Sequence, residues 1–561
     1  MSSTLRLRPS ILAGIVLAVS TLSGCVLDES SEAPATAPTP PLRPNFLVIL
    51  ADDLGYSDLG AFGGEIDTPN LDKLASEGRL LTNFRTATMC SPSRAQLMSG
   101  TDHHLVGLGA MAELTSSSQR GQPGYEGYLT DKAHSIAELL RDNGYSTYMS
   151  GKWHLGLTQA LGAQARGFEK SFILRGNSDL HYDTASVGLN RSSQYSENGV
   201  EVAIPSPFFS TDYYTDKLIS FIGNGRQNGK PFFAWAAYTA PHWPLQAPEA
   251  YLAKYRGKYD RGYEVFRQER FNRQKQLGLI PSSQQLGAPV VPAKASNAAL
   301  WDDLSNEQKE FQARRMEVYA AMVDNLDHNI GRLIQHLKDI GEYDNTVIIF
   351  TSDNGPEGVF RDSGGGNNNA YDNLGKPSSY ISQGPRWAEV SAVPHHLWKR
   401  TAGEGGVVVP TIVRMPGQKT AAAPLRQIAS LTDIAPTLLE LAGIADPGTR
   451  SGSRTGLYPI TGVSLAALLN DKSTVARPAG TVLAHELHGY AYVLQDQWKL
   501  AYQYNGEGSG TWELFDLASD PSEQQDLSAT RVDKTDALKQ AFRDYATRVN
   551  LVPYAVNAPP Q

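Results

Sequence analysis

The chain has 561 residues, of which 41% are hydrophobic and 19% are charged, and its formal net charge is −8. This length exceeds what one simple hydrophobic core accommodates, so we expect a large domain and a smaller one. A chain this acidic has no broad basic surface for a phosphate backbone, which excludes nucleic acid as a partner. Its two cysteines exclude both a disulfide scaffold and a cysteine-rich metal site.

The first cysteine belongs to an export signal. Arg6 and Arg8 precede the apolar stretch Ile11–Leu22, whose length of about 12 residues falls short of the roughly 20 that a membrane-spanning helix needs. The stretch ends in Leu-Ser-Gly-Cys, which resembles a bacterial lipobox with Cys25 as the lipidated first residue of the mature chain. An ordinary signal peptide that contains a cysteine is the alternative.

The lipobox predicts how the N-terminus is used. Residues 1–24 are the lipoprotein signal peptide, and residues 25–44 are the acylated cysteine with a Pro-rich, semi-extended tether. The protein is then exported and anchored to the bacterial envelope, and its only membrane contact is the N-terminal lipid anchor. Val26 in place of an aspartate favours the outer membrane, with the protein facing the periplasm or the outside.

After residue 44 the chain alternates strands with helices. The expected strands are apolar runs at Asn45–Ala51, Tyr145–Ser150, Pro231–Tyr238 and Thr346–Ser352. The expected helices cover residues 68–78, 130–143 and 305–340, and Ser305 with Gln308 forms a capping box at the head of the last one. This alternation predicts an α/β fold in which helices flank a mainly parallel central sheet.

The pattern changes after about residue 481. Four short strands and a last helix over residues 534–549 predict a smaller C-terminal α+β domain with an antiparallel sheet. The expected division is therefore a large domain over residues 45–475 and the smaller one over 476–561. Residues 256–300 and 363–384 are long surface excursions.

Polar residues follow each of the four expected strands. They are Asp52 and Asp53, then Lys152 and His154, then His242, and finally Asp353 and Asn354. Each has an ordinary alternative, because an acidic pair after a strand is often a turn or a cap and a lone histidine is often packed. Parallel strands, however, bring their carboxyl ends to one edge of the sheet, where α/β proteins bind ligands.

The types of these residues indicate the chemistry of that edge. Three carboxylates and an amide are hard oxygen ligands, which suit Ca²⁺ or Mg²⁺ better than the nitrogen and sulfur ligands typical of zinc sites. Lysines and histidines beside them suit a bound oxyanion.

The second cysteine lies in the segment Met89-Cys90-Ser91-Pro92-Ser93-Arg94. Pro92 and Gly100 place Cys90 at the N-terminus of a helix, where the dipole favours an anion. A buried structural cysteine and a thiolate nucleophile are the alternatives. Composition alone gives about 0.01 expected occurrences of Cys-x-Pro-x-Arg, so chance is a weak explanation.

This segment resembles the first signature of the type I sulfatases of the alkaline phosphatase superfamily, and the likeness is closest to bacterial arylsulfatases. Further matches are Gly144–His154 (GYSTYMSGKWH), Ala240–Pro244 (APHWP), Ser352–Gly355 (SDNG), and Lys399 five residues before Glu404-Gly405-Gly406. The likeness runs from about Pro44 to the C-terminal helix and implies an alkaline-phosphatase-like large domain. Ser99 and Val408 depart from the usual Thr and Arg, neither at a catalytic position.

The resemblance implies a sulfuric ester hydrolase that cleaves aryl or small alkyl sulfate esters to a phenol or alcohol and inorganic sulfate. Cys90 is oxidised to Cα-formylglycine by a maturation enzyme, and its hydrate is the nucleophile that forms a covalent sulfated intermediate. One Ca²⁺, with Mg²⁺ as the less favoured ion, is held by Asp52, Asp53, Asp353, Asn354 and residue 90.

The resemblance also assigns roles to the remaining residues. Arg94 and Lys152 fix the formylglycine and the sulfate. Lys399 and His242 contact the sulfate and protonate the leaving group. His154 takes the proton that allows sulfate release, and Asp353 also deprotonates the attacking hydroxyl.

Two other functions remain open at this point. One is a phosphate or phosphonate ester hydrolase of the same superfamily, and the other is a non-catalytic lipoprotein that binds sulfated glycans. The sequence does not identify the leaving group. Tyr371, Tyr380 and Trp387 form an aromatic wall for it or, equally, belong to a solvated loop.

Overall fold

The computed structural model describes residues 43–178, 180–183, 194–225, 228–289, 298–362, 367–451, 454–504 and 508–554. The expected signal peptide, Cys25 and most of the tether lie outside these residues. None of the helices in these ranges has the length and apolarity needed to cross a bilayer. The Arg43 guanidinium donates to the carbonyl oxygens of Ala442 and Asn143, so the chain is held against the folded body from this residue onward.

A ten-stranded sheet forms the centre of the fold, in the order β10-β2-β9-β8-β1-β7-β3-β4-β5-β6. The strands are β1 (Asn45–Ala51), β2 (Arg79–Arg85), β3 (Ser146–Lys152), β4 (Lys170–Leu174), β5 (Tyr195–Glu197), β6 (Val200–Glu201), β7 (Phe232–Ala237), β8 (Thr346–Ser352), β9 (Val408–Arg414) and β10 (Ala429–Ser430). The adjacent strands β8, β1, β7, β3 and β4 are parallel, whereas β9 is antiparallel to β8 and β2. The prediction of a mainly parallel sheet is confirmed.

The central strands are apolar because both of their faces are covered. On β1, Leu47 and Ile49 pack into one core cluster, while Phe46, Val48 and Leu50 pack into the other. The first cluster lies against α1 (Pro69–Glu77), α4 (Ser210–Gly225) and α7 (Asn306–Asp339). The second lies against α2 (Cys90–Ser99), α3 (Ile136–Asp142), α10 (Ile434–Leu441) and α11 (Ala466–Leu469).

Local capping residues set the start of two helices, α7 and α3. At the start of α7 the Ser305 hydroxyl accepts the N–H of Gln308, and the Gln308 side chain accepts the N–H of Ser305, as the sequence predicts. The helix expected from residue 130 begins only at Ile136, because Ser135 caps it and Glu138 closes the capping box. The remaining helices are α5 (Glu249–Lys254), α6 (Tyr263–Gln276), α8 (Pro385–Ala392), α9 (Glu404–Val407) and α12 (Val532–Arg548).

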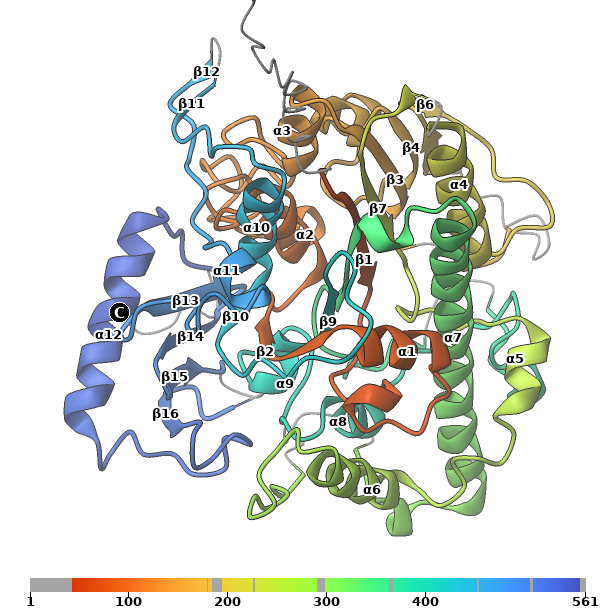
Figure 1. Ribbon diagram of the computed structural model, residues 1–561. Helices are drawn as coiled ribbons and strands as arrows, with labels where there is room; N and C mark the ends of the chain where they lie inside the picture. The colour runs from red at the N-terminus through yellow and green to blue at the C-terminus, as the bar shows by residue number, and fades with distance from the viewer. Residues whose placement is uncertain are drawn as a thin grey trace, which may run out of the picture. The chain divides into compact units, whose positions relative to one another are not determined.

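The C-terminal region forms a second, antiparallel sheet in the order β13-β14-β15-β16, which confirms the predicted smaller α+β element. Its strands are β13 (Val482–Leu487), β14 (Tyr490–Gln495), β15 (Trp498–Tyr502) and β16 (Trp512–Asp516). Helix α12 packs on one face of this sheet (Figure 1), where Leu538 and Phe542 lie in one cluster with Val493 and Leu500. A two-residue pair, β11 (Arg450–Ser451) with β12 (Arg454–Thr455), lies outside both sheets.

A buried histidine network connects this second sheet to the loop after α2. His104 Nδ1 lies 3.1 Å from Asp102 Oδ1, and His104 Nε2 lies 3.3 Å from Glu486 Oε2 on β13. The Tyr545 hydroxyl on α12 donates to Asp102 Oδ2 at 3.1 Å. Burial lowers the pKa of His104, but the hydrogen bonds to Asp102 and Glu486 outweigh burial and raise it to about 9. His104 is therefore a buried imidazolium at neutral pH.

Stability is expected to fall at alkaline pH because of His104. A histidine whose folded pKa exceeds the unfolded value of about 6.5 stabilises the fold fully below that pH and loses this contribution as the pH rises through about 9. The upward shift of the His104 pKa corresponds to a contribution on the order of 3 kcal/mol to the free energy of unfolding. Thermal unfolding from about pH 6 to about pH 10 should show a shallower alkaline decline for His104→Gln than for wild type.

His134→Gln is the matched control for this experiment, because burial lowers the pKa of His134. That variant should keep the alkaline decline of the wild-type protein. Identical pH dependences for wild type and His104→Gln would show that His104 is not the charged group.

Candidate functional site

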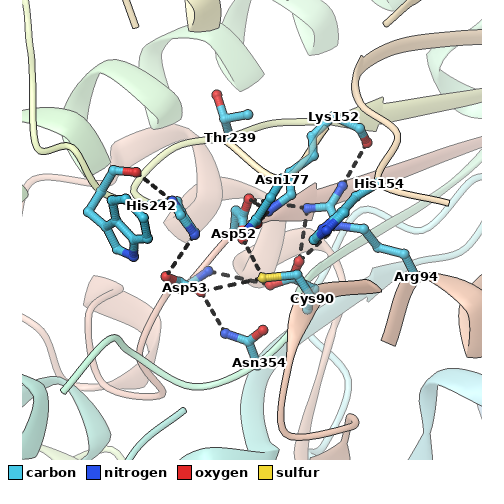
Figure 2. Close-up of polar contacts among 12 residues, drawn as sticks. Asp52, Asp53, Cys90, Arg94, Lys152, His154, Asn177, Thr239, His242 and Asn354 are labelled. Atoms are coloured by element: carbon cyan, nitrogen blue, oxygen red, sulfur yellow. Dashed lines mark hydrogen bonds and ion pairs between the residues drawn. The ribbon is translucent and has the colours of Figure 1, made fainter. Parts of the chain in front are cut away.

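Four adjacent parallel strands end at the same edge of the large sheet. Asp52 and Asp53 follow β1, and Asp353 and Asn354 follow β8. Lys152 is the last residue of β3, and the loop after β7 carries His242. The structure gathers these residues with Cys90, Arg94, His154 and Lys399 in one buried cluster, so all ten residues singled out in the sequence lie together. Figure 2 labels all of them except Asp353 and Lys399.

The cluster is centred on Cys90 and the first acidic pair. Cys90 Sγ lies 3.3 Å from Asp52 Oδ1 and 3.9 Å from Asp53 Oδ1. Cys90 is the first residue of α2 and is fully buried. Burial raises the pKa of its thiol well above the ordinary value, and the charges of Asp353 and Asp52 raise it further. Cys90 is thus a protonated thiol beside carboxylates.

Arg94 connects the helix to the strand ends. It lies one helical turn after Cys90, so both side chains project from the same face of α2. Its Nε donates to Asp353 Oδ2 at 3.0 Å, and another guanidinium nitrogen donates to the Lys152 carbonyl oxygen at 2.7 Å. The one-turn spacing of Cys90 and Arg94 therefore places a cation directly across the acidic cluster.

Each residue of the first acidic pair has a lysine partner. Lys152 Nζ lies 2.6 Å from Asp52 Oδ2, and Lys399 Nζ lies 2.7 and 2.9 Å from the two oxygens of Asp53. Burial raises the pKa of Asp52, but the charge of Lys152 and of the other cations outweighs it and holds the pKa well below its usual range. Burial prevails at Asp53 and raises its pKa to about 7 despite Lys399.

His242 presents one nitrogen to this cluster. Its Nδ1 lies 2.5 Å from the carbonyl oxygen of Trp243, which places the proton on Nδ1. Its Nε2 has no hydrogen-bond partner among the described residues and lies 3.7 Å from Asp53 Oδ2 (Figure 2). Burial and the nearby Lys399 lower the pKa of His242 well below its ordinary value.

His154 is held by a carboxylate that the sequence does not reveal. Its Nε2 lies 2.9 Å from Glu113 Oε1, while its buried Nδ1 has no hydrogen-bond partner in the described ranges. Burial lowers the pKa of His154 to about 4, although the hydrogen bond to Glu113 acts in the opposite direction. The neutral ring therefore keeps its proton on Nε2, toward Glu113, and leaves Nδ1 as an acceptor.

Two further site residues had no local sequence signal. Glu113 lies 41 positions before its partner, in a 3-10 helix over Ala112–Leu114, and Asn177, whose Oδ1 accepts from Lys152 Nζ at 3.2 Å, follows β4. Position 151 must also be glycine, because a Cβ there would lie 1.9 Å from the Ala237 carbonyl oxygen on β7. Only glycine permits β3 to carry Lys152 this close to its neighbour.

The donor set fits a hard divalent cation. Asn354 Nδ2 donates to Asp53 Oδ1 at 2.7 Å, while Asn354 Oδ1 is buried without a partner in the described part of the chain. The ligand atoms of Asp52, Asp53, Cys90 and His242 all lie within 4.8 Å of one another. An unpartnered amide oxygen next to buried carboxylates is the oxygen-rich environment that Ca²⁺ or Mg²⁺ requires.

The profile of the sulfatase family matches residues 44–444. An uncharacterized sulfatase of Schizosaccharomyces pombe is 40% identical over 532 residues, which cover 91% of this chain and 94% of that protein. This chain belongs to the sulfatase family. Residues 395–547 of this sulfatase also match the profile described as N-sulphoglucosamine sulphohydrolase, C-terminal.

Other relatives narrow the activity to the hydrolysis of sulfate esters. The arylsulfatase of Klebsiella aerogenes is 37% identical over 438 residues, covering 76% of this sulfatase and 92% of the relative. The N-acetylgalactosamine-6-sulfatase of Canis lupus familiaris is 25% identical over 553 residues, covering 92% and 87%. A sulfatase from Pseudoalteromonas sp. has the same fold, with a TM-score of 0.60, 22% identity and coverage of 91% and 92%.

Proposed function

We propose that this sulfatase hydrolyses aryl sulfate esters to a phenol and inorganic sulfate, with formylglycine made from Cys90 by a maturation enzyme and with one bound Ca²⁺. The observation that carries the proposal is the position of Cys90, a buried helix N-terminus enclosed by Asp52, Asp53, Lys152 and Arg94. The 37% identity to an arylsulfatase supports an aryl rather than a glycan substrate.

The environment of Cys90 argues against a simple thiolate enzyme. Burial and the adjacent carboxylates raise the pKa of the thiol, and a protonated thiol is a poor nucleophile. When present, formylglycine supplies a hydroxyl nucleophile on hydration, and the bound cation supplies positive charge at the sulfate oxygens. Conversion of Cys90 therefore resolves the conflict between its location and its chemistry.

The chain's own residues supply the remaining functions. Lys152, Lys399 and Arg94 place three cations around Cys90, and such fixed cations stabilise the charge on the equatorial oxygens of a reacting sulfate. His242 turns Nε2 toward the site. Because the hydrogen bond to Trp243 places the ring proton on Nδ1, Nε2 must take up a proton once the anionic ester is bound before His242 serves the leaving-group oxygen as a proton donor. His154 has Nδ1 free to accept a proton in the later release of sulfate, and Glu113 holds its ring in that orientation.

The N-terminal features remain part of the proposal. Lipidation at Cys25 would anchor the exported enzyme to the bacterial envelope, and the outer membrane is the proposed site. Labelling of cells with a radioactive fatty acid tests this, because a Cys25→Ser variant should lose the label.

Hydrolysis of matched esters tests the reaction itself. We expect 4-nitrophenyl sulfate to be hydrolysed with a kcat/KM at least about 10²-fold above that for 4-nitrophenyl phosphate. The carboxylates of the site offset part of the charge of its three cations and one divalent ion, so the remaining positive charge suits a monoanionic sulfate ester better than a dianionic phosphate ester. Sulfate release by ion chromatography and phenol release by absorbance measure both products. Faster hydrolysis of the phosphate would favour a phosphoesterase, and binding without hydrolysis would favour a glycan-binding protein.

The two histidines are expected to fail differently. His242→Ala should lower turnover by about 10²-fold or more and most strongly for phenols of high pKa, because a proton donor matters most for poor leaving groups. His154→Ala should make turnover nearly independent of the phenol, since the step that it serves no longer contains the leaving group. Turnover over a series of substituted phenyl sulfates measures both slopes. Equal slopes for the two variants would disprove this division of roles.

A further inference from the structure

An aromatic and cationic surface adjoins His242 on the outside of the site. The rings of His242 and Trp243 are stacked, with centroids 4.8 Å apart and an interplanar angle of 30°. Tyr380 meets Trp243 edge-on at 5.7 Å, and the Arg361 guanidinium carbon lies 5.8 Å from the centre of the indole. We call Trp243, Tyr380 and Arg361 the outer triad. Trp243 lies after β7, Arg361 lies after β8, and Tyr380 belongs to the segment 367–384.

The outer triad is distinct from the nearby aromatic core. Trp387, which the sequence offered for an aromatic wall, is fully buried against Tyr259 and Tyr263, so that prediction is wrong for Trp387. The three members of the outer triad instead remain partly exposed. They are therefore placed to meet a ligand rather than to fill the core.

Arg361 has hydrogen-bonding capacity to spare. Its side chain is 37% exposed, although its Nε is buried without a hydrogen-bond partner in the described ranges, and the distance from Nε to Glu357 Oε2 is 3.9 Å. Glu357 is buried, and its other oxygen accepts the Val359 N–H at 2.8 Å. The ion pair is longer than a hydrogen bond, so the guanidinium keeps donors for another anion.

Side-chain hydrogen bonds fix the backbone at two members of the outer triad, Arg361 and Tyr380. The Arg361 N–H donates to Ser382 Oγ at 2.8 Å, and the Tyr380 N–H donates to Asn369 Oδ1 at 2.7 Å. Asn369 Nδ2 in turn donates to the carbonyl oxygen of Tyr380 at 3.0 Å. These contacts fix the backbone from which the Arg361 and Tyr380 side chains project, which lowers the entropic cost of binding.

We propose that the outer triad is the leaving-group subsite and selects a planar aromatic ring that carries an acidic substituent, so that the substrate is the sulfate ester of a phenolic acid. This inference rests on the proposed function, because it places the ring bonded to the oxygen served by His242. The faces and edges of Trp243 and Tyr380 receive the ring, and the Arg361 guanidinium binds the carboxylate through paired hydrogen bonds.

A pair of nearly isosteric substrates tests the subsite. Wild type should hydrolyse 4-carboxyphenyl sulfate with a kcat/KM at least about 10-fold above that for 4-carbamoylphenyl sulfate, because only the first carries a second negative charge. Arg361→Gln should abolish this preference through a higher KM for the carboxylate and leave the amide within about 2-fold. Arg361→Lys should restore part of the preference, since it keeps the charge without the paired geometry.

Two further variants complete the experiment. Trp243→Leu should raise KM for both esters by about 10-fold, because it removes the ring platform and no charge. Arg531→Gln is the matched control, since Arg531 likewise lies over an indole, that of Trp498, 4.7 Å from its centre. It should leave both substrates unchanged.

The outcomes separate this inference from the proposed function. If wild type hydrolyses neither ester nor a sulfated sugar, the proposed function fails. If it hydrolyses both esters but Arg361→Gln retains the wild-type preference, the subsite is wrong and the sulfatase activity stands. A higher kcat/KM for glucosamine 6-sulfate than for 4-carboxyphenyl sulfate would overturn the aromatic assignment.

Discussion

Replacing Cys90 with alanine is expected to lower kcat/KM for aryl sulfates by at least about 10³-fold, because the reaction loses its nucleophile. In active wild-type enzyme the peptide containing residue 90 should have a mass about 18 Da below its cysteine form, the change from thiol to aldehyde, and should react with hydrazides. Peptide mass spectrometry and steady-state kinetics on the same preparation measure the two effects.

Ser91→Ala is the matched control for this prediction. Ser91 lies in the same helical turn and is also buried, but its hydroxyl has no hydrogen-bond partner among the described residues. The control should keep its activity and the mass change at residue 90. A fully active wild-type enzyme with an unmodified Cys90 thiol would refute the proposed chemistry and leave only the family assignment.

Replacing Asp353 with alanine is expected to remove the bound cation and to lower activity by about 10³-fold, because it deletes one of three carboxylates in the donor set. It should also destabilise the protein by about 3–5 kcal/mol, since the buried Arg94 guanidinium loses its partner at 2.9 Å. Elemental analysis should find about one calcium per wild-type chain and much less in the variant.

Asp58→Ala separates the loss of the cation from general destabilisation. Asp58 pairs with Arg270 at 2.6 Å, and both side chains are buried. The variant should therefore be destabilised to a similar extent but retain its cation after purification. Retained metal in Asp353→Ala would contradict the assigned donor set, and stoichiometric zinc in wild type would contradict the assignment of a hard cation.

The site residues on strand ends were predictable because a short sequence pattern determines where they lie. Seven-residue apolar runs such as Asn45–Ala51 and Thr346–Ser352 are suited to a strand buried on both faces, and both strands have these bounds in the structure. The parallel arrangement then brings Asp52 and Asp353 to one edge. Cys90 and Arg94 were predictable because the segment that contains them resembles a signature of the family, and in the structure one helical turn separates them.

Other features were decided only by the tertiary structure. Glu113 meets His154, and Lys399 meets Asp53, across long stretches of chain, and no periodicity in the sequence records such contacts. The same holds for β9, whose antiparallel insertion between β8 and β2 depends on strand order rather than on its own residues.

The burial of the aromatic side chains could not be predicted from the sequence. Composition and spacing identify Tyr380 and Trp387 as aromatic residues near one excursion, but their burial depends on distant partners. Trp387 packs against the α6 residue Tyr263 and is buried in the core, whereas Tyr380 contacts Trp243 beside the site. Local patterns thus determine the strands, the helix that carries Cys90 and the identity of the reacting groups. Which side chains surround those groups is decided by contacts between segments that only the folded chain brings together.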